Sequence, residues 1–551
     1  IYLLKMMGGP NALILLSVMG SIVAYLLSFA HQQKKLKLIS GVSSIVLLSL
    51  LFVGVLYSSY EFHFTKGAED APEGVIKEFS AWNAISRVDL FSKEDYKYII
   101  IDSDAYTKVA NLEKEEEFKT REDLGAIAYL INPNSNALII GAGGGVDVVR
   151  ALAFNNTVTG IEINEIIVND IMKGKAREAS GDLFFKDKVN IIIDEGRSYI
   201  KRSQEQYSTI QISLIDTWAA TAAGAFTLTE NNLYTVEAFM DYITHLKEGG
   251  ILTTTRWTFE KPQETIRLAG IALEALERLG IKEPQNNLVI VKKKVQIPNE
   301  QRTHFEGVAN LLVKRSSFTK EEMSLIVEKS KEYDFEIIYN PYEIQDNLYN
   351  SLIRNKERTS FYKGYSLDIS PTYDDRPFFF YTVRLKDTIN IFKLFSGEYE
   401  KEIHLKTNLG LFLLLITFFL TLLSAILFIL LPLFIKKRQD MRSKTINKFL
   451  ILLYFVGLGF GFIFIEISLM QKFILFLGHP IYSLSVVLFS LLVFSGIGSY
   501  TTKKIPDDKL KRHIIINFIF LCLFIITYAF FLSNFFGNYI GMRLSARIIL
   551  S

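Results

Sequence analysis

Four glycines after a short hydrophobic segment form the clearest candidate ligand-binding feature of this sequence. Residues 139–152 are IIGAGGGVDVVRAL, and the glycines are Gly141, Gly143, Gly144 and Gly145. Glycines at such positions permit a tight turn and let backbone N–H groups approach a ligand at the start of the next helix. Val146 stands where the third glycine of the dinucleotide pattern G-x-G-x-x-G is expected. The spacing therefore disfavours a pyrophosphate cofactor.

Acidic residues end the next two predicted strands. Glu162 ends the first of them, about 20 residues after the turn, where a carboxylate can accept both hydroxyls of a ribose. Asp194 and Glu195 follow the second, where an acid can bind an adenine amino group. Glycine turns and strand-end acids occur in many α/β proteins, so each feature alone has an ordinary structural explanation. In this order, after successive strands, they favour a nucleoside ligand.

Strands and helices alternate around these residues. The predicted strands begin near residues 136, 157, 189, 209 and 250, and helices are predicted at 146–154, 165–179, 196–204 and 233–246. This alternation predicts a parallel sheet with helices on both faces, a Rossmann-like α/β fold. Short alternating segments at 85–91 and 96–109 predict a small β-rich portion before it.

Six apolar segments flank this α/β region. They cover residues 11–30, 39–60, 409–435, 449–470, 481–500 and 514–532, and 49% of the whole chain is hydrophobic. At a rise of about 1.5 Å per residue, each segment can cross about 30 Å of hydrocarbon. We therefore expect a soluble domain inserted between transmembrane helices of a lipid bilayer, two before it and four after it.

The expected division of the chain follows from these patterns. It consists of two transmembrane helices in 1–60, a linker and β-rich subdomain in 61–125, the Rossmann-like nucleoside-binding domain in 126–300, a C-terminal α/β extension in 301–405, and four transmembrane helices in 406–551. The chain begins without Met, so further segments before residue 1 are an expectation.

Charge patterning and the supply of a nucleoside give opposing expectations for the side of the membrane on which the soluble domain lies. Three loops between apolar segments are basic, and the positive-inside rule places them in the cytoplasm, with the soluble domain outside. Nucleoside cofactors are made in the cytoplasm, which favours the opposite side for a domain that binds one. A net charge of +3 without a basic stripe argues against nucleic acid, and one cysteine, Cys522, excludes a thiolate metal site. No metal is expected.

The segments IIGAGGGVDVVRAL, VTGIEINEIIV, IIIDEGRSYI and ISLIDTW, with the β-rich portion before them, resemble the spermidine synthase (polyamine aminopropyltransferase) family. The resemblance covers roughly residues 80–260 and is strongest to membrane-fused bacterial members; S-adenosylmethionine-dependent methyltransferases are wider relatives. It implies decarboxylated S-adenosylmethionine, or S-adenosylmethionine itself, as the cofactor. An amine or another small acceptor would attack the carbon next to the sulfonium, and no metal is implied.

Three departures from the family pattern concern its charged residues. The Asp that family members carry within the glycine turn is replaced by Gly144 or Gly145. Their Asp pair spaced D-x-x-D after the fourth strand is Ser213 and Asp216 here. Their Tyr-His-Glu segment before the first strand becomes REDLGAIAYL.

Asp216 is the candidate base, because it follows a strand at the edge where such folds bind ligands. It would take a proton from the acceptor or bind a cationic one. Trp218 could offer its π face to a sulfonium or an amine, and Ser213 is a weaker candidate for the same acceptor site. The alternative is that Asp216 caps the following segment and Trp218 only packs.

Two segments outside the α/β core leave alternatives open. Asp374 and Asp375 in DISPTYDDRPFFFY could bring an acid pair to the site, or Arg376 could anchor a turn that seals the domain to the membrane. Glu466 lies in an apolar segment with Gln471 and His479 nearby. A carboxylate there could serve transport, or it could lie at the membrane interface.

The sequence thus leads to two hypotheses. The first is a membrane-anchored transferase that uses an S-adenosyl nucleoside to alkylate an amine or another small acceptor. The second is a non-catalytic sensor or transporter-like protein that retains an enzyme-derived nucleoside-binding domain. A homo-oligomer is compatible with either.

Overall fold

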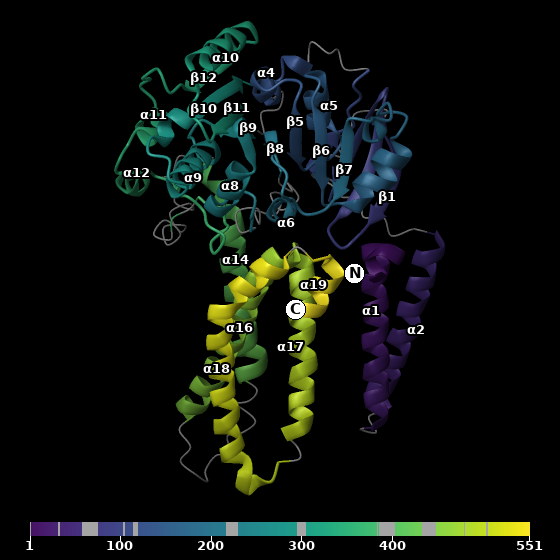
Figure 1. The fold of residues 1–551 in the computed structure, drawn as a ribbon. Coiled ribbons are helices and arrows are strands. Elements are labelled where there is room, and N and C mark those ends of the chain that lie inside the picture. The colour runs from purple at the N-terminus through teal and green to yellow at the C-terminus, as the bar shows by residue number, and fades with distance from the viewer. Residues whose placement is uncertain are drawn as a thin grey trace.

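The computed structural model describes residues 2–30, 34–57, 75–102, 105–113, 120–215, 230–294, 305–382, 384, 403–431, 448–478, 480–502, 505–540 and 542–551. It contains a large α/β domain with a small sheet on one flank, and long helices that extend from one end of that domain (Figure 1).

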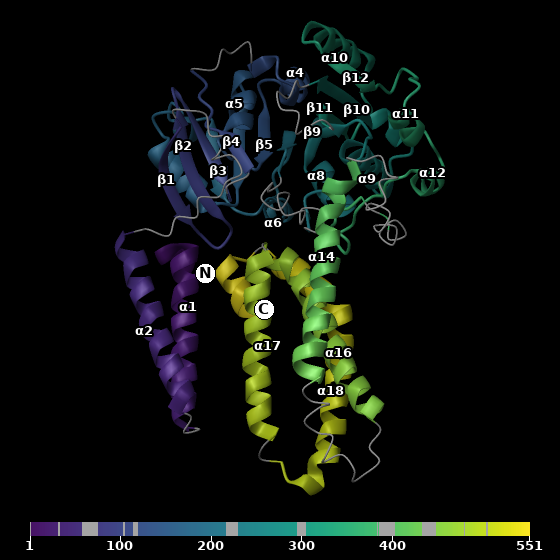
Figure 2. The same ribbon diagram turned by 180° about the vertical axis from the view of Figure 1, so that it is seen from behind.

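The small sheet forms the expected β-rich portion. Its strands pair antiparallel in the order β1-β2-β3-β4, and they are β1 (Ile76–Trp82), β2 (Arg87–Lys93), β3 (Tyr96–Ile101) and β4 (Ala105–Lys108). Figure 2 shows this sheet beside β5 and α5 of the large domain. Val88, Leu90 and Ile99 are fully buried in the core that the two parts share. The small sheet is therefore packed onto the large domain through its own apolar side chains.

The large sheet has eight strands in the order β12-β10-β11-β9-β8-β5-β6-β7. Their bounds are β5 (Asn136–Ile140), β6 (Thr157–Glu162), β7 (Val189–Ile193), β8 (Tyr207–Ser213), β9 (Leu246–Phe259), β10 (Leu288–Lys294), β11 (Phe305–Lys314) and β12 (Glu336–Tyr339). The five strands from β7 to β9 pair parallel, as expected. The remaining three pairings, β9 with β11, β11 with β10 and β10 with β12, are antiparallel.

The expected parallel sheet is confirmed for these five strands, and three antiparallel strands extend it. Strand β11 pairs with both β9 and β10, so one continuous sheet crosses the boundary expected at residue 300. Strands β10 and β11 follow one another in the chain, and consecutive antiparallel strands need no crossover helix between them. The extension after residue 300 therefore supplies strands to the same sheet.

Helices cover both faces of the sheet. On β5, Leu138 and Ile140 point into a core with α8 (Val236–Thr244) and α9 (Glu264–Arg278). Ala137 and Ile139 point into the opposite core with α5 (Val146–Ala153) and the π-helix η2 (Ile166–Lys175). Successive side chains on a strand face opposite ways, so this apolar run fills two layers. The other helices of the domain are η1 (Leu124–Ala126), α4 (Ile127–Ile131), η3 (Leu183–Phe185), α6 (Gly196–Arg202), η5 (Pro284–Asn287), α10 (Lys320–Glu332), α11 (Leu348–Ile353) and α12 (Arg358–Gly364).

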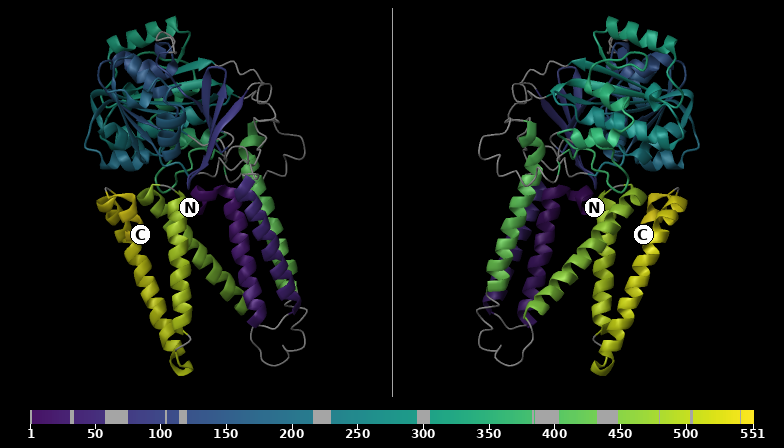
Figure 3. Two further views of the ribbon diagram at one scale, coloured as in Figure 1. Left: turned by 90° about the vertical axis from the view of Figure 1, so that its right-hand side faces the viewer. Right: turned by 90° about the vertical axis from the view of Figure 1, so that its left-hand side faces the viewer.

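Long apolar helices stand at both ends of the chain. They are α1 (Tyr2–Ala30), α2 (Lys34–Tyr57), α14 (Ile403–Ala425) with η8 (Ile426–Leu430), α16 (Lys448–Leu477), α17 (Pro480–Thr502) and α18 (Asp507–Tyr539), followed by the short α19 (Leu544–Leu550). All of them lie on one side of the α/β domain (Figure 3). Phe428 and Phe530 are among their many exposed aromatic side chains, at 77% and 81% exposure. Such surfaces favour a lipid environment.

Five of the six expected membrane segments meet the requirements of length and composition within the described residues. The five helices lie at Leu3–Phe29, Lys34–Leu56, Leu452–Leu477, Pro480–Thr502 and Asp508–Leu532. The segment expected at 409–435 is helical in α14 and η8, the apolar helix found there among the described residues is Leu414–Ile429, and 432–435 lie outside the described residues.

Candidate active site

The glycine turn joins the end of β5 to the start of α5. Gly141, Gly143 and Gly145 have φ values of 80°, 47° and 87°, in the left-handed region that favours glycine. The N–H groups of Gly141 and Ala142 donate to the Ile161 carbonyl at 2.8 and 3.0 Å. The turn is thereby tied to β6, and α5 begins directly after it.

Glu162 lies against this turn, as the spacing predicted. Its Oε2 accepts the Gly143 N–H at 2.9 Å and its Oε1 accepts the Asn164 N–H at 2.9 Å. The residue is only 7% exposed, and burial raises the pKa of its carboxyl, partly offset by the backbone N–H donors. A carboxylate offers about four lone-pair sites, so about two remain for further donors. Neutral hydroxyl donors suit a buried acid whose partners in the described chain are backbone N–H groups.

Gly144 packs against the small sheet and leaves no room for a side chain. Its carbonyl accepts the Ala110 N–H at 2.8 Å. A Cβ on Gly144 would lie 2.1 Å from the carbonyl oxygen of Lys108 and 3.3 Å from Thr107 Oγ1. In the spermidine synthase pattern an Asp stands within this turn. The end of β4 fills the space that such an Asp at Gly144 would need.

We expect Gly144→Ala to lower the free energy of unfolding by about 1–3 kcal/mol, the usual cost of forcing an extra carbon into packed backbone. The measurement is the denaturant dependence of unfolding of the full chain in detergent. Gly364→Ala is the matched control, since a Cβ there would meet nothing within 4 Å. Equal stability of the two variants would contradict the close packing of β4 on the turn.

Asp194 and Glu195 are both engaged by α6. Asp194 lies beside Glu162, because its N–H donates to the Glu162 carbonyl at 3.1 Å. Its Oδ2 pairs with Arg202, and its Oδ1 accepts the Glu195 N–H at 2.9 Å. Glu195 caps the helix by accepting the N–H groups of Arg197 and Ser198 at 2.9 and 2.7 Å. Their predicted contact with adenine stays a prediction, and their visible role is to fix α6 at the end of β7.

The candidate acceptor residues are only partly described. Ser213 ends β8, and its Oγ accepts a bond from Gln211 Nε2 at 3.1 Å. Asp216 and Trp218 lie outside the described residues. Their predicted roles as base and π surface therefore stay predictions.

A buried polar network beside the turn was missed by the sequence analysis. Gln211 on β8 donates to Asp147 Oδ1 at 2.8 Å and accepts from the Tyr129 hydroxyl at 2.5 Å. Arg150 pairs with Asp147 and, at 2.8 Å, with Asp123. These bonds join the first turn of α5 to β8, across the point where the strand order reverses. The available signal was Gln211 within the apolar run TIQIS and Asp147 within GVDVVR.

The DISPTYDDRPFFFY segment returns to the domain through Asp374. Arg197 on α6 donates to its two carboxylate oxygens at 3.1 and 3.0 Å, and Thr235 donates to Asp374 Oδ1 at 2.7 Å. Arg376 instead pairs with Asp368 at 3.1 Å. The anchor of this turn is therefore Arg197 of the α/β domain, whereas the sequence analysis had named Arg376.

On the long apolar helix α16, Gln471 contacts Glu230 of the α/β domain, with Gln471 Nε2 3.2 Å from Glu230 Oε1. Glu466 is half-buried on α16. His479 lies outside the described residues.

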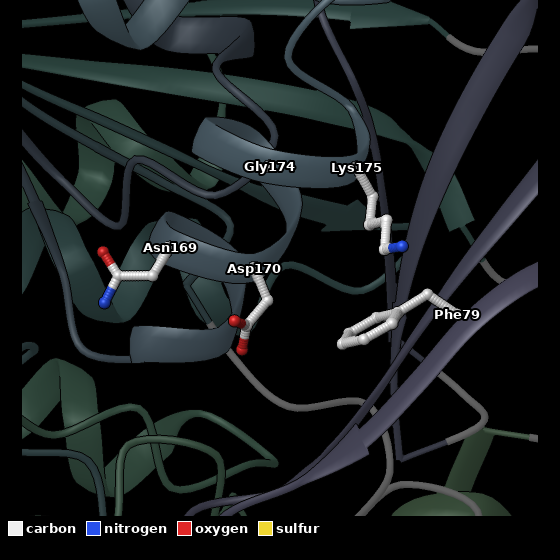
Figure 4. A pocket seen from close by; sticks show the side chains of 5 residues that line it. All are labelled: Phe79, Asn169, Asp170, Gly174 and Lys175. Carbon is white, nitrogen blue, oxygen red and sulfur yellow. The ribbon is translucent and has the colours of Figure 1, made fainter.

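A cavity of about 420 Å³ lies away from the glycine turn, between β1 and η2. Figure 4 shows its lining, with the ring of Phe79 on one side and Asp170 and Lys175 on the other. Asn169 and Gly174 complete it. None of the predicted site residues lines this cavity.

Comparisons with known proteins place a family domain over the glycine turn. Residues 117–273 match the spermine/spermidine synthase domain. The chain is 28% identical over 172 residues to a polyamine aminopropyltransferase of Thermoplasma volcanium, covering 30% of this chain and 57% of that relative. A polyamine aminopropyltransferase of Buchnera aphidicola is 24% identical over 165 residues, covering 30% of this chain and 53% of that relative. The chain thus spans little more than half the length of these relatives.

Among solved structures, a spermidine synthase from Thermotoga maritima aligns with 18% identity and a TM-score of 0.33, covering 48% of this chain and 80% of that one. The domain match includes β5, the glycine turn, Glu162 and the strands up to β9. Residues 117–273 therefore form a spermidine synthase-like domain.

Proposed function

We propose that this chain is a membrane-anchored transferase that moves an aminopropyl group from decarboxylated S-adenosylmethionine to an amine. The observation that carries the proposal is the bond between Glu162 and Gly143 within a spermidine synthase-like domain. The names of the relatives, polyamine aminopropyltransferases, support the same reaction class.

The residues at the turn fit an adenosyl nucleoside. Glu162 keeps about two lone-pair sites, which suits the two hydroxyls of a ribose. A Cβ on Gly143 would make an ordinary van der Waals contact with Thr107 Cγ2 at 3.7 Å, so the backbone is less crowded there than at Gly144. Asp194, one residue beyond β7, is the proposed partner of the adenine amino group.

When bound, the nucleoside supplies a sulfonium-linked carbon to which an amine nitrogen can bond as the C–S bond breaks. The protein then needs to orient the amine and accept its proton. We assign the proton to Asp216 and the orientation of the amine to Ser213 and Trp218, because Ser213 ends β8 and the other two follow it in the sequence. Because Gly144 carries no side chain, the small sheet packs directly against this side of the turn.

Methyl transfer from S-adenosylmethionine is a second candidate, favoured by one observation. The glycine turn has no carboxylate at Gly144 or Gly145, so it lacks the acid that would hold an aminopropyl ammonium in family members. S-adenosylmethionine carries a carboxylate beside its ammonium, and a turn without an acid does not repel that carboxylate.

Titration of the full chain in detergent with the two nucleosides separates these candidates. Tighter binding of the decarboxylated form, with aminopropyl addition to a diamine detected by mass, is the expected result. Tighter binding of S-adenosylmethionine with methyl addition would favour the second candidate. Folded protein that binds neither nucleoside would contradict both.

We also expect nucleoside affinity to fall as the pH is lowered through the raised pKa of Glu162, since the ionised carboxylate is the form that accepts both hydroxyls. The step should lie above the ordinary glutamate value of about 4.3. Because the pKa of Glu162 is raised in the folded state, ionisation of this carboxyl lowers the free energy of unfolding above that pKa. Protonation at lower pH removes this loss. Protonation of Glu162 therefore does not unfold the domain, and a lower affinity at low pH would not come from unfolding caused by this group. The measurement is the dissociation constant against pH, and Glu162→Gln should show no such step.

Anchoring in a lipid bilayer is proposed from the apolar helices at both ends of the chain. Basic loops favour an extracytoplasmic α/β domain, whereas supply of the nucleoside favours a cytoplasmic one.

A further inference from the structure

The edge of the sheet that carries the candidate site faces the membrane helices. Parallel strands β6 and β7 end at this edge, and α6 follows β7 there (Figure 1). Both side views show the long helices leaving the α/β domain from that end (Figure 3). The loops after the strands are where such sheets bind ligands.

Contacts from α1 and α16 meet the first residues after β6 and β7. Lys5 on α1 donates to Glu165, three residues after Glu162, at 2.7 Å. Gly478, next to the end of α16, lies so close to α6 that a Cβ there would be 3.3 Å from Glu195 Cβ and 3.4 Å from Ser198 Oγ. These helices therefore border the same edge as the ribose-binding candidate.

A third contact joins α16 to the segment that follows β8. Gln471 Nε2 donates to Glu230 Oε1 at 3.2 Å. Burial raises the pKa of Glu230, and the bond from Gln471 offsets part of that rise. On α19, the nearly fully buried Arg547 donates to the Phe476 carbonyl at 2.7 Å and interacts electrostatically with Glu195.

Two other flanks of the edge are occupied by the α/β domain itself. The chain after β4 covers the turn through the bond from Ala110 N–H to the Gly144 carbonyl. The 368–382 segment closes another flank, where the Asn231 N–H donates to the Pro377 carbonyl at 2.7 Å. Among the described contacts, helices from both ends of the chain therefore meet the edge at the membrane junction.

The carboxylates of the edge differ in their partners. Lys5 pairs with Glu165 and Arg202 pairs with Asp194. Glu162 accepts backbone N–H groups and keeps lone-pair sites for further donors. The exposed apolar side chains of the helices suit a hydrocarbon tail.

We propose that the acceptor is an amphipathic amine held in the bilayer, whose head group reaches the carboxyl edge at the junction formed by Lys5, Gln471 and Gly478. This inference rests on the proposed aminopropyl transfer. The amine nitrogen forms a bond to the aminopropyl carbon, the C–S bond breaks, and its electron pair stays on sulfur as the neutral thioether 5′-methylthioadenosine. The proton lost by the nitrogen passes to Asp216.

The test compares two acceptors with the same diamine head. The full chain in phosphatidylcholine vesicles, which contain no primary amine, receives decarboxylated S-adenosylmethionine with 1,4-diaminobutane or with its N-dodecyl derivative at equal total concentration. Release of 5′-methylthioadenosine and the product mass are measured. We expect the dodecyl amine to react at least about tenfold faster, because confinement to the membrane raises its concentration at the site.

Equal rates, or a faster reaction of the soluble diamine, would overturn the membrane acceptor and leave the aminopropyl transfer standing. Turnover of neither amine by folded protein would overturn the transfer reaction itself, and the acceptor proposal with it. The two failures are therefore distinct.

Gln471→Ala tests the junction directly. We expect its rate with the dodecyl amine to fall by about tenfold, the scale of one hydrogen bond to a charged group, and its rate with the soluble diamine to fall by a clearly smaller factor. Thr527→Ala is the control, since Thr527 is exposed on α18 and donates to the Leu523 carbonyl of its own helix. A parallel loss of both rates in Gln471→Ala would show a merely structural contact and overturn the proposal.

Discussion

Arg197→Met should lower the free energy of unfolding of the α/β domain by about 3–5 kcal/mol, the cost of leaving buried charges without their partner. Arg197 is 1% exposed. Its guanidinium donates to Asp374 at 3.0 and 3.1 Å and to Asp241 at 2.8 Å, so the substitution strands two carboxylates. Denaturant unfolding of the full chain in detergent, followed by circular dichroism, measures the loss.

Arg376→Met is the matched control for this prediction. The side chain of Arg376 is 60% exposed, and its pair with Asp368 at 3.1 Å is screened by water. Exposed pairs contribute about 0–1 kcal/mol, so the control should be nearly as stable as the natural chain. If both variants lost the same stability, the buried bonds of Arg197 would not be what holds the 368–382 segment to α6.

The alternation of strands and helices could be predicted because its causes are local. Apolar runs such as Ala137 to Ile140 fill two cores at once, one on each face, and this is the pattern of a strand covered by helices on both sides. The glycines and acidic residues that follow these runs marked the ends of the strands. The parallel part of the sheet, from β7 to β9, followed from those signals.

The antiparallel part could not be predicted in the same way. Strand β10, with the sequence LVIVKKK, has no local feature that states which neighbour it pairs with or in which direction. Its pairing with β12, and the pairing of β11 with β9, join strands that are separated in the chain by other helices and strands. Tertiary packing decided these neighbours, so the boundary expected at residue 300 fell within a sheet.

The candidate site shows the same division. Glu162 and Gly143 could be paired from their spacing, because a carboxylate at the end of one strand lies next to the turn after its parallel neighbour. The packing of Lys108 on Gly144 could not, since it depends on how a separate sheet docks. The bond from Arg197 to Asp374 spans 177 residues and has no local signature.

The second large effect is expected at Glu162. Glu162→Ala should weaken binding of the S-adenosyl nucleoside by about 1.5–3 kcal/mol, or roughly 10- to 150-fold, through lost hydrogen bonds to a charged group. The substitution also removes the acceptor of the Gly143 and Asn164 N–H groups, which loosens the turn. Calorimetric titration of the full chain in detergent measures the affinity.

A control and a ligand analogue separate ribose binding from loss of the turn. Glu322→Ala removes another carboxylate that accepts a backbone N–H, from Thr319 at 2.9 Å, on α10 away from the glycine turn. It should lower stability without changing nucleoside affinity. An analogue lacking both ribose hydroxyls should bind the natural chain weakly. The Glu162→Ala variant should bind this analogue no more weakly than it binds the full nucleoside, because the coupling is lost with either partner. If the variant still preferred the hydroxylated nucleoside as strongly as the natural chain does, Glu162 would not be the ribose ligand, and its raised pKa would reflect burial in a turn that binds something else.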